Sequence, residues 1–188
     1  HLNLLPHLKE LIAALRKKGQ EFANIIKMGR TQLQDAVPMT LGQTFNGFAS
    51  ILEDELKHLD EAAADFLTVN MGATAIGTGI CAEPGYSEKC VKAMCDITGF
   101  EFKIADDLVG ATSDTSCMVG YSSALRRVCV KMNKICNDLR LLACGPRCGL
   151  SEFNLPAMQP GSSIMPGKVN PVIPEVMSQV CYKVMGND

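Results

Sequence analysis

The sequence predicts an all-α protein, a bundle of long helices whose connecting loops carry the functional groups. Apolar residues recur at intervals of three and four over most of the chain, which is the spacing of amphipathic helices. No segment alternates apolar and polar residues for long, and the aromatic and β-branched runs typical of strands are sparse. We therefore expect residues 1–188 to form a single helical-bundle domain.

The first half of the chain contains two long helical patterns. The first covers about residues 5–27 and ends near Gly29, where a polar turn follows. The second covers about residues 41–67, with apolar residues on one side and charged residues on the other. Residues 68–85 break the helical spacing with four glycines, and composition alone favours a flexible connector there.

The second half contains three further helical patterns. A short helix is expected at about residues 87–97, with Ser87 as its N-cap and Gly99 after its end. The longest pattern covers about residues 113–144, which corresponds to about 48 Å of helix. A last helix is expected at about residues 174–185. Because the longest helix is apolar on more than one face, we expect it to pack against copies of this chain, with a monomer as the alternative.

The composition is that of a globular protein without a nucleic-acid or membrane partner. Hydrophobic residues make up 47% of the chain and charged residues 20%, and the net charge is -2. The basic residues are scattered and have no aromatic residues between them, which disfavours a nucleic-acid surface. No apolar run approaches the roughly 20 residues that span a bilayer, and no signal-peptide pattern opens the chain. We expect a cytoplasmic protein.

The nine cysteines predict neither a disulfide framework nor a zinc site. No two of them form a C-x-x-C pair, the count is odd, and only three histidines are available as further ligands. Cys129 and Cys136 are seven residues apart on one face of the longest helix, where a free cysteine packs as a small hydrophobic residue. The sequence therefore predicts reduced, buried thiols, and it predicts no metal and no cofactor.

Residues 161–171, with the sequence GSSIMPGKVNP, carry the strongest functional pattern. Two glycines and two prolines within eleven residues prevent a regular helix or strand, so this segment is expected to be a loop. A loop can turn Ser162, Lys168 and Asn170 toward one point, and its glycines allow backbone N–H groups to approach an anion. A site for a carboxylate is the functional interpretation, and a polar surface loop is the alternative.

This loop resembles the signature loop of the fumarase/aspartase superfamily, whose members eliminate a group from a succinate-like skeleton to give fumarate. Other blocks of the same superfamily are matched in consistent order over nearly the whole chain, at residues 30–43, 72–79, 111–114 and 131–146. The likeness is strongest to the members that remove ammonia from L-aspartate. The resemblance implies a carbon–nitrogen lyase with the central helical domain of that fold.

The resemblance also implies a role for each polar residue. Removing ammonia from aspartate requires a base close to the proton, and hydrogen-bond donors for the charge that develops on the neighbouring carboxylate. The resemblance gives the base role to Ser162, whose alkoxide the backbone N–H groups of Ile164 and Met165 would support. It implies substrate binding by Thr31, Gln32, Ser163, Lys168 and Asn170.

One position separates the possible reactions. Fumarases resemble this chain but have a histidine where Gln32 lies, and that histidine is thought to pair with a glutamate placed like Glu175. Glutamine carries no charge and relays no proton, so Gln32 favours ammonia over water as the leaving group, with Glu175 in a supporting role. Fumarate hydratase is the alternative reaction. A non-catalytic helical scaffold, as in the lens crystallins of this superfamily, is a further alternative that an intact Ser162, Lys168 and Asn170 argue against.

The resemblance implies a homotetramer in which each active site collects residues from three subunits. A third substrate-binding segment of the superfamily, a Thr-Ser run with an asparagine, is not found in these residues. We therefore expect this chain to be the central part of a longer protein, and the 188 residues alone to lack lyase activity.

Overall fold

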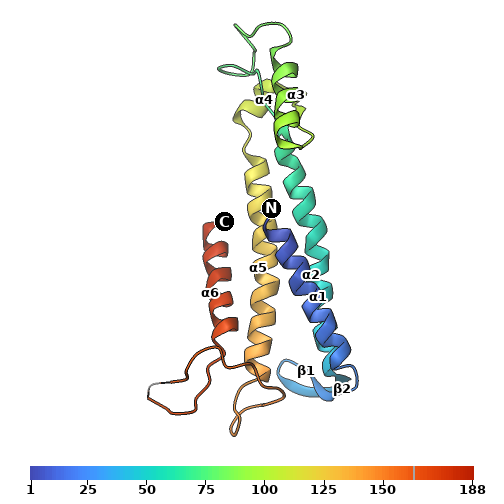
Figure 1. The fold of residues 1–188 in the computed structure, drawn as a ribbon, viewed down its shortest axis with the longest axis vertical. Helices are drawn as coiled ribbons and strands as arrows, with labels where there is room; N and C mark the ends of the chain where they lie inside the picture. The colour runs from blue at the N-terminus through green and yellow to red at the C-terminus, as the bar shows by residue number, and fades with distance from the viewer. Residues whose placement is uncertain (163) are drawn as a thin grey trace. The chain divides into compact units, whose positions relative to one another are not determined.

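The computed structural model describes residues 1–162 and 164–188. Over these residues long helices dominate (Figure 1), and the strands form two small two-stranded sheets. In chain order the elements are α1 (Leu4–Glu21), β1 (Ile26–Thr31), β2 (Gln34–Thr40), α2 (Leu41–Ala64), the 3-10 helix η1 (Asp65–Leu67), β3 (Thr68–Val69), α3 (Tyr86–Thr98), β4 (Lys103–Ile104), α4 (Leu108–Ser113), α5 (Ser116–Leu142) and α6 (Val172–Asn187). The predicted helical class is confirmed. Among the described residues, no helix combines the length and apolar character that crossing a membrane requires.

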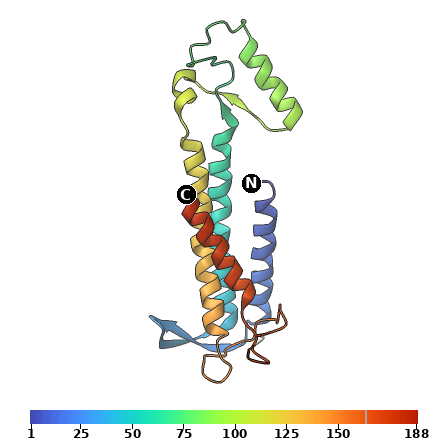
Figure 2. The same ribbon diagram turned by 90° about the vertical axis from the view of Figure 1, so that its left-hand side faces the viewer.

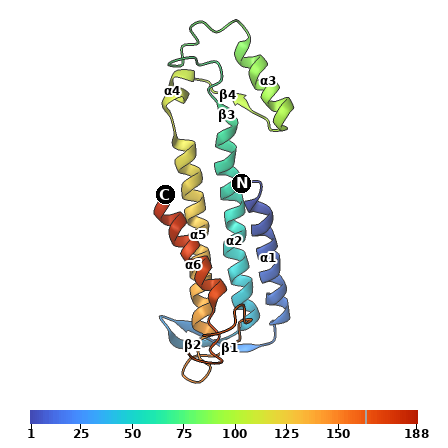
Figure 3. The ribbon, with the colours of Figure 1, turned by 60° about the vertical axis from the view of Figure 1, so that its left-hand side comes forward.

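The chain divides into two compact units. The first unit contains residues 1–56 and 125–188, and the second contains residues 57–124. Within the first unit, α1, α6 and the first-unit parts of α2 and α5 run side by side (Figure 2, Figure 3). The β1–β2 hairpin lies at the end of this unit where α5 stops and the segment leading to α6 begins (Figure 3). The expected single domain over 1–188 stays a prediction.

The core of the first unit is built from the apolar faces that the helical spacing predicts. Its buried members include Leu8 and Ile12 from α1, Phe48 and Leu52 from α2, and Val128 and Ile135 from α5. Helices α1 and α2 approach each other closely at two glycines, since a Cβ atom on Gly42 would lie 2.4 Å from the carbonyl oxygen of Gly19. No side chain fits at this contact.

One carboxylate is fully buried between α2 and α5. Glu55 Oε2 accepts a hydrogen bond from Arg127 Nε at 2.9 Å, and Glu55 Oε1 accepts one from Arg127 Nη2 at 3.0 Å. The ammonium of Lys131, one turn further along α5, lies 2.5 Å from Glu55 Oε1. Burial by itself would raise the pKa of Glu55, but the hydrogen bonds and charges of Arg127 and Lys131 outweigh it and lower the pKa to about 2.

The nine cysteines are all free, and three of them are buried between α5 and α6, namely Cys129, Cys136 and Cys181. Burial raises the pKa of each of these thiols, and that of Cys181, which lies beside Cys129, to about 12. Cys81 and Cys148 are exposed. The prediction of free, buried cysteines is confirmed for Cys129 and Cys136.

The second unit contains the end of α2, the start of α5 and the elements between them. Strands β3 and β4 pair in parallel, and the ring of Phe66 meets that of Tyr121 edge to face at 5.8 Å. The glycine-rich segment 68–85 is packed in part, since Ala73 is buried and a Cβ atom on Gly77 would lie 2.3 Å from Val109 Cα. Composition alone did not indicate this packing.

Three local predictions differ from the structure. Helix α1 ends at Glu21 rather than near residue 27, and the stretch predicted as a polar turn forms the β1–β2 hairpin. Ser87 is not an N-cap, because α3 begins after Gly85 and has no side-chain cap. The longest helix starts at Ser116, and residues 108–113 form the separate helix α4, whose N-cap Asp107 accepts hydrogen bonds from the backbone.

Candidate active site

The described part of the 161–171 loop is closed by two backbone hydrogen bonds. The N–H of Ser162 donates to the carbonyl oxygen of Lys168 at 3.2 Å, and the N–H of Lys168 donates to that of Met165 at 3.2 Å. Gly161 and Gly167 have φ angles of 85° and 79°, in the left-handed region that glycine adopts without strain. The glycines that exclude a helix in the sequence thus permit the turn. Ser163 lies outside the described residues.

The hydroxyl oxygen of Ser162 accepts two backbone hydrogen bonds from its own loop. The donors are the N–H groups of Ile164 at 3.3 Å and Met165 at 3.2 Å. Because N–H groups directed at an oxygen favour its negatively charged form, this arrangement is suited to a serine that must lose its proton. Ile164 and Met165 therefore lie where the predicted role requires donors, and the role itself stays a prediction.

Three of the predicted residues line one cleft of about 620 Å³ in the first unit. Lys168 and Asn170 reach it from the loop, and Glu175 reaches it from the first turn of α6. Ser162 is not among the residues that line it. The cleft is completed by Arg140 in the last turn of α5 and by residues of the 143–157 segment. Its lining carries two cationic groups and one carboxylate, which suits an anionic ligand.

Sequence reasoning missed Arg140. Its Nη2 lies 3.7 Å from Glu175 Oε1, so the partner of Glu175 within this chain is a guanidinium. The available signal was a basic residue in the final turn of the longest predicted helix, where cations are favoured. What the pattern could not show is that α6 would bring Glu175 to that turn.

Thr31 and Gln32 lie at the tip of the β1–β2 hairpin rather than in the cleft with Lys168. Thr31 is the last residue of β1, and Gln32 and Leu33 form the turn with φ angles of 52° and 63°. Both positive angles match the turn type that connects twisted antiparallel strands. The side chains of all three residues are exposed, and Gln32 and Leu33 line a second cleft of about 610 Å³ beside the hairpin.

An irregularity in the hairpin separates its tip from its base. Thr31 pairs with Gln34 and Arg30 with Asp35, but Gly29 pairs with Val37, so Ala36 is an extra residue on β2. A Cβ atom on Gly29 would lie 2.8 Å from the carbonyl oxygen of Val37, so only glycine fits there.

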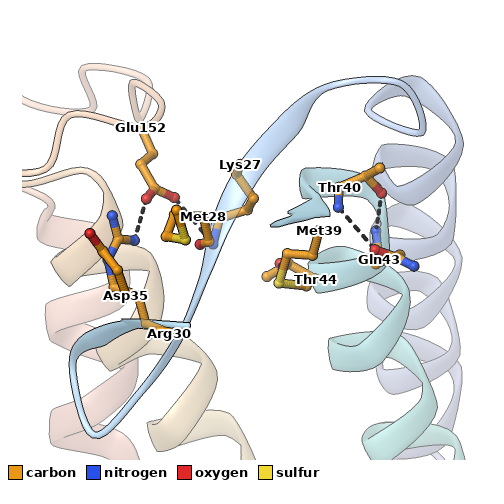
Figure 4. Close-up of polar contacts among 9 residues, drawn as sticks. All are labelled: Lys27, Met28, Arg30, Asp35, Met39, Thr40, Gln43, Thr44 and Glu152. Atoms are coloured by element: carbon orange, nitrogen blue, oxygen red, sulfur yellow. Dashed lines mark hydrogen bonds and ion pairs between the residues drawn. The ribbon is translucent and has the colours of Figure 1, made fainter. Parts of the chain in front are cut away.

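The hairpin leads directly into a capped helix. The N–H of Gln43 donates to Thr40 Oγ1 at 3.1 Å, and the N–H of Thr40 donates to Gln43 Oε1 at 2.9 Å (Figure 4). This reciprocal pair is a capping box, and it satisfies two backbone N–H groups at the start of α2. The Thr-x-x-Gln spacing was visible in the sequence and indicates where α2 begins.

Glu152 connects the hairpin to the segment that follows α5. Its carboxylate accepts a hydrogen bond from Arg30 Nη1, and its Oε2 lies 3.3 Å from the ammonium of Lys27 (Figure 4). Asp35 Oδ1 lies 3.3 Å from Arg30 Nε on the other side. The hydrogen bond to Glu152 raises the pKa of Arg30. Sequence reasoning missed Glu152, because a charge 122 residues from its partner carries no local signal.

Comparison with known proteins gives one consistent assignment. The family model described as "Lyase" matches residues 1–186. A protein of Corynebacterium glutamicum named aspartate ammonia-lyase is 59% identical over 98% of this chain and 35% of its own length. Proteins of the same name from Pseudomonas aeruginosa and Escherichia coli are 58% and 54% identical over 100% of this chain, which spans 40% and 39% of their lengths.

Solved structures show the same fold. A structure titled fumarate lyase:delta crystallin from Brucella melitensis is 58% identical with a TM-score of 0.93, covering 96% of this chain and 39% of that one. A class II fumarase from Schistosoma mansoni is 37% identical with a TM-score of 0.94, covering 97% of this chain and 41% of that one. The described chain therefore corresponds to well under half of each relative.

Proposed function

The chain belongs to the Lyase family, and from this premise we propose that the whole protein is a carbon–nitrogen lyase that converts L-aspartate to fumarate and ammonia. Support comes from the identity of 54–59% with three relatives named aspartate ammonia-lyase. Gln32 supports the same reaction, since a neutral carboxamide cannot take the proton-relay role of a histidine. We expect no cofactor or metal in the reaction, and a cytoplasmic protein.

The observation that carries the mechanism is the pair of N–H groups directed at Ser162 Oγ. Ser162 as alkoxide removes a proton from the carbon next to the side-chain carboxylate of aspartate, and the electron pair moves into that carboxylate as an aci-carboxylate. Collapse of this dianion expels ammonia from the neighbouring carbon and forms the double bond of fumarate. The N–H groups of Ile164 and Met165, at 3.3 and 3.2 Å, lower the energy of the alkoxide from which the reaction starts.

Substrate binding is proposed for residues of both the loop and the hairpin. Lys168 and Asn170 border the same cleft and can bind one carboxylate by charge and by hydrogen bonds. Thr31, Gln32 and Ser163 complete the set. Glu175 supports the site through its partner Arg140, which compensates its charge so that the cleft keeps the positive charge of Lys168 for the substrate.

We propose a homotetramer with shared sites, because the hairpin tip and the loop lie in different places of one chain. Exposed apolar residues on the first-unit faces of α5 and α6 supply surface for such an assembly, namely Val130, Leu141, Ile173, Val176, Val180 and Tyr182. A second subunit could bring its own hairpin tip to the loop of the first.

Fumarate hydratase is the second candidate function. The class II fumarase likeness, with a TM-score of 0.94, favours it, and Gln32 argues against it. The full-length protein should be assayed with L-aspartate and with malate, following fumarate by its ultraviolet absorbance. Rapid fumarate release from aspartate alone would support the lyase proposal. Release from malate alone would replace it with hydration, and release from neither would favour a non-catalytic helical scaffold.

A further inference from the structure

An ion-pair cluster joins two segments that are distant in sequence. Glu152 lies in the segment between α5 and α6, and both cations that it contacts, Lys27 and Arg30, lie on β1. Figure 4 shows the carboxylate of Glu152 facing the guanidinium of Arg30 and lying beside Lys27. The side chains of Lys27, Glu152 and Arg30 are only 10%, 14% and 20% exposed. Charges this well shielded from water interact more strongly than surface pairs, and removing one partner costs more.

One end of this cluster is attached to a proposed site segment, and the other end is attached to the core of the first unit. On the hairpin, Arg30 directly precedes Thr31 and Gln32. On the other side, Phe153 follows Glu152 and meets the ring of Phe45 on α2 edge to face at 6.3 Å. Because Phe45 is buried, the backbone at Glu152 is held against the core of the first unit.

Most of the hairpin near its tip is exposed in the described structure. Five of the seven residues of β2 are exposed, and the tip residues Gln32 and Leu33 are exposed as well. Asp35 also pairs with Arg30, but its side chain is 73% exposed and belongs to the same hairpin. Asp35 therefore cannot fix the hairpin relative to the rest of the unit.

We propose that Glu152 is a positioning residue for substrate binding, which holds the hairpin tip with Thr31 and Gln32 in place through its ion pairs to Arg30 and Lys27. This proposal rests on the proposed function, because it assumes that the tip contacts the substrate. Glu152 itself touches no reacting atom. Removing the Glu152 carboxylate leaves the side chains of Thr31 and Gln32 unchanged but allows the hairpin tip to move. A residue that binds substrate directly would have no such effect on the tip.

The test uses the full-length protein with Glu152→Gln, Arg30→Gln and the double variant. Asp35→Asn is the matched control, since it removes the exposed carboxylate from the same guanidinium. We expect Glu152→Gln to lower kcat/KM for L-aspartate about 10- to 100-fold, mainly by a higher KM, because small displacements of positioning groups have effects of that size. Asp35→Asn should stay within about twofold, as exposed pairs contribute little. The double variant should lose less than the product of the two single losses, since Arg30 and Glu152 share one interaction, and the pair with Lys27 is lost only where Glu152 is changed.

Hydrogen–deuterium exchange at residues 31–34 supplies a readout that does not depend on activity. Glu152→Gln should speed exchange there at least several-fold, with exchange in α2 unchanged. Unchanged exchange at the tip, or a kcat/KM within twofold of wild type, would overturn the proposal. If Glu152→Gln does not fold, Arg30→Lys replaces it in the test, because lysine keeps the charge but loses the planar guanidinium. We then expect smaller changes in the same direction, in both kcat/KM and exchange at residues 31–34. A wild-type protein that does not release fumarate from aspartate would refute the proposed function, while the exchange data would still decide whether Glu152 holds the hairpin.

Discussion

At the scale of single residues, Ser162 poses the main chemical question, because a serine hydroxyl is a very weak acid at neutral pH. The two N–H groups at 3.2 and 3.3 Å from its oxygen provide part of the stabilisation that an alkoxide needs. They come from residues two and three positions later in the chain, so both donors belong to the same loop as the proposed base.

Replacing this oxygen tests the base role. In the full-length protein, Ser162→Ala should lower kcat for aspartate deamination by about three orders of magnitude or more, because the change removes the proposed base. The fumarate assay and a circular dichroism spectrum check the rate and the fold together. Ser50→Ala, which removes an exposed hydroxyl on α2, is the control and should stay within about twofold. A near-normal rate in Ser162→Ala would remove the serine from the base role.

The loop residues could be found from the sequence because they are close together in one recognisable string. Arg140 and Glu152 could not, since each becomes relevant only through a partner that the fold brings near, Glu175 for the first and Arg30 for the second. Ion pairs between residues this far apart in the sequence form only through the tertiary structure, and neither composition nor local spacing predicts them.

At the scale of elements, the buried Glu55 connects α2 to α5 and makes their contact sensitive to acid. Its pKa is lowered from 4.5 to about 2 in the folded chain, so its contribution to stability is complete above about pH 4.5 and is lost as the pH falls toward 2. The lowered pKa corresponds to about 3 kcal/mol of unfolding free energy.

Comparison of wild type with Glu55→Gln in urea, followed by circular dichroism between pH 6 and pH 2, measures this contribution. The variant should be less stable at pH 6, because two cations lose a buried partner, and the difference should shrink as the pH falls. Glu53→Gln at the half-exposed pair with Arg16 should show a much smaller effect. A difference that does not change with pH would contradict the assignment.

The contact between α1 and α2 yields a prediction with an internal control. Gly42→Ala places a methyl group 2.4 Å from the carbonyl oxygen of Gly19, so it should destabilise the chain by about 1–3 kcal/mol. Gly47→Ala lies in the same helix with no atom within 4 Å of its new Cβ, and should stabilise by about 0.5–1 kcal/mol. Thermal unfolding measures both variants, and we expect the melting temperature to fall for Gly42→Ala and to rise for Gly47→Ala. Equal changes in melting temperature would show that helix propensity, and not packing against Gly19, determines the effect.

The helices could be predicted because their apolar residues repeat with the helical period and form the observed core. The hairpin could not, because strands with most residues exposed have no alternation of apolar and polar residues to detect. The Thr40–Gln43 capping box and the N-cap Asp107 of α4 are local patterns, so the sequence contains the information that predicts both helix starts.

At the scale of the whole molecule, the separation of the hairpin tip from the loop predicts complementation between inactive subunits. Thr31→Val and Ser162→Ala should each be nearly inactive in the full-length protein. If a site takes Thr31 from one subunit and Ser162 from another, mixed assemblies contain intact sites. Refolding the two variants together in equal amounts should then restore about one quarter of wild-type activity.

Activity of the mixture, compared with each variant refolded alone, measures this directly. No recovery in verified mixed assemblies would place both residues in one subunit. We expect the 188-residue chain alone, which covers 35–40% of the relatives compared, to show no fumarate release, since the resemblance implies a third substrate-binding segment that is not among these residues.

The cysteines buried between α5 and α6 have a consequence for how this protein meets oxidants and alkylating reagents. The thiolate is the reactive form of cysteine, and a pKa of about 12 leaves Cys181 almost entirely protonated at neutral pH. Cys81 and Cys148 are open to attack at once, whereas Cys181 becomes reactive only when α6 detaches from α5. In the described chain, modification of Cys81 or Cys148 therefore leaves the buried core unchanged, whereas a modified Cys181 would no longer fit between α6 and α5.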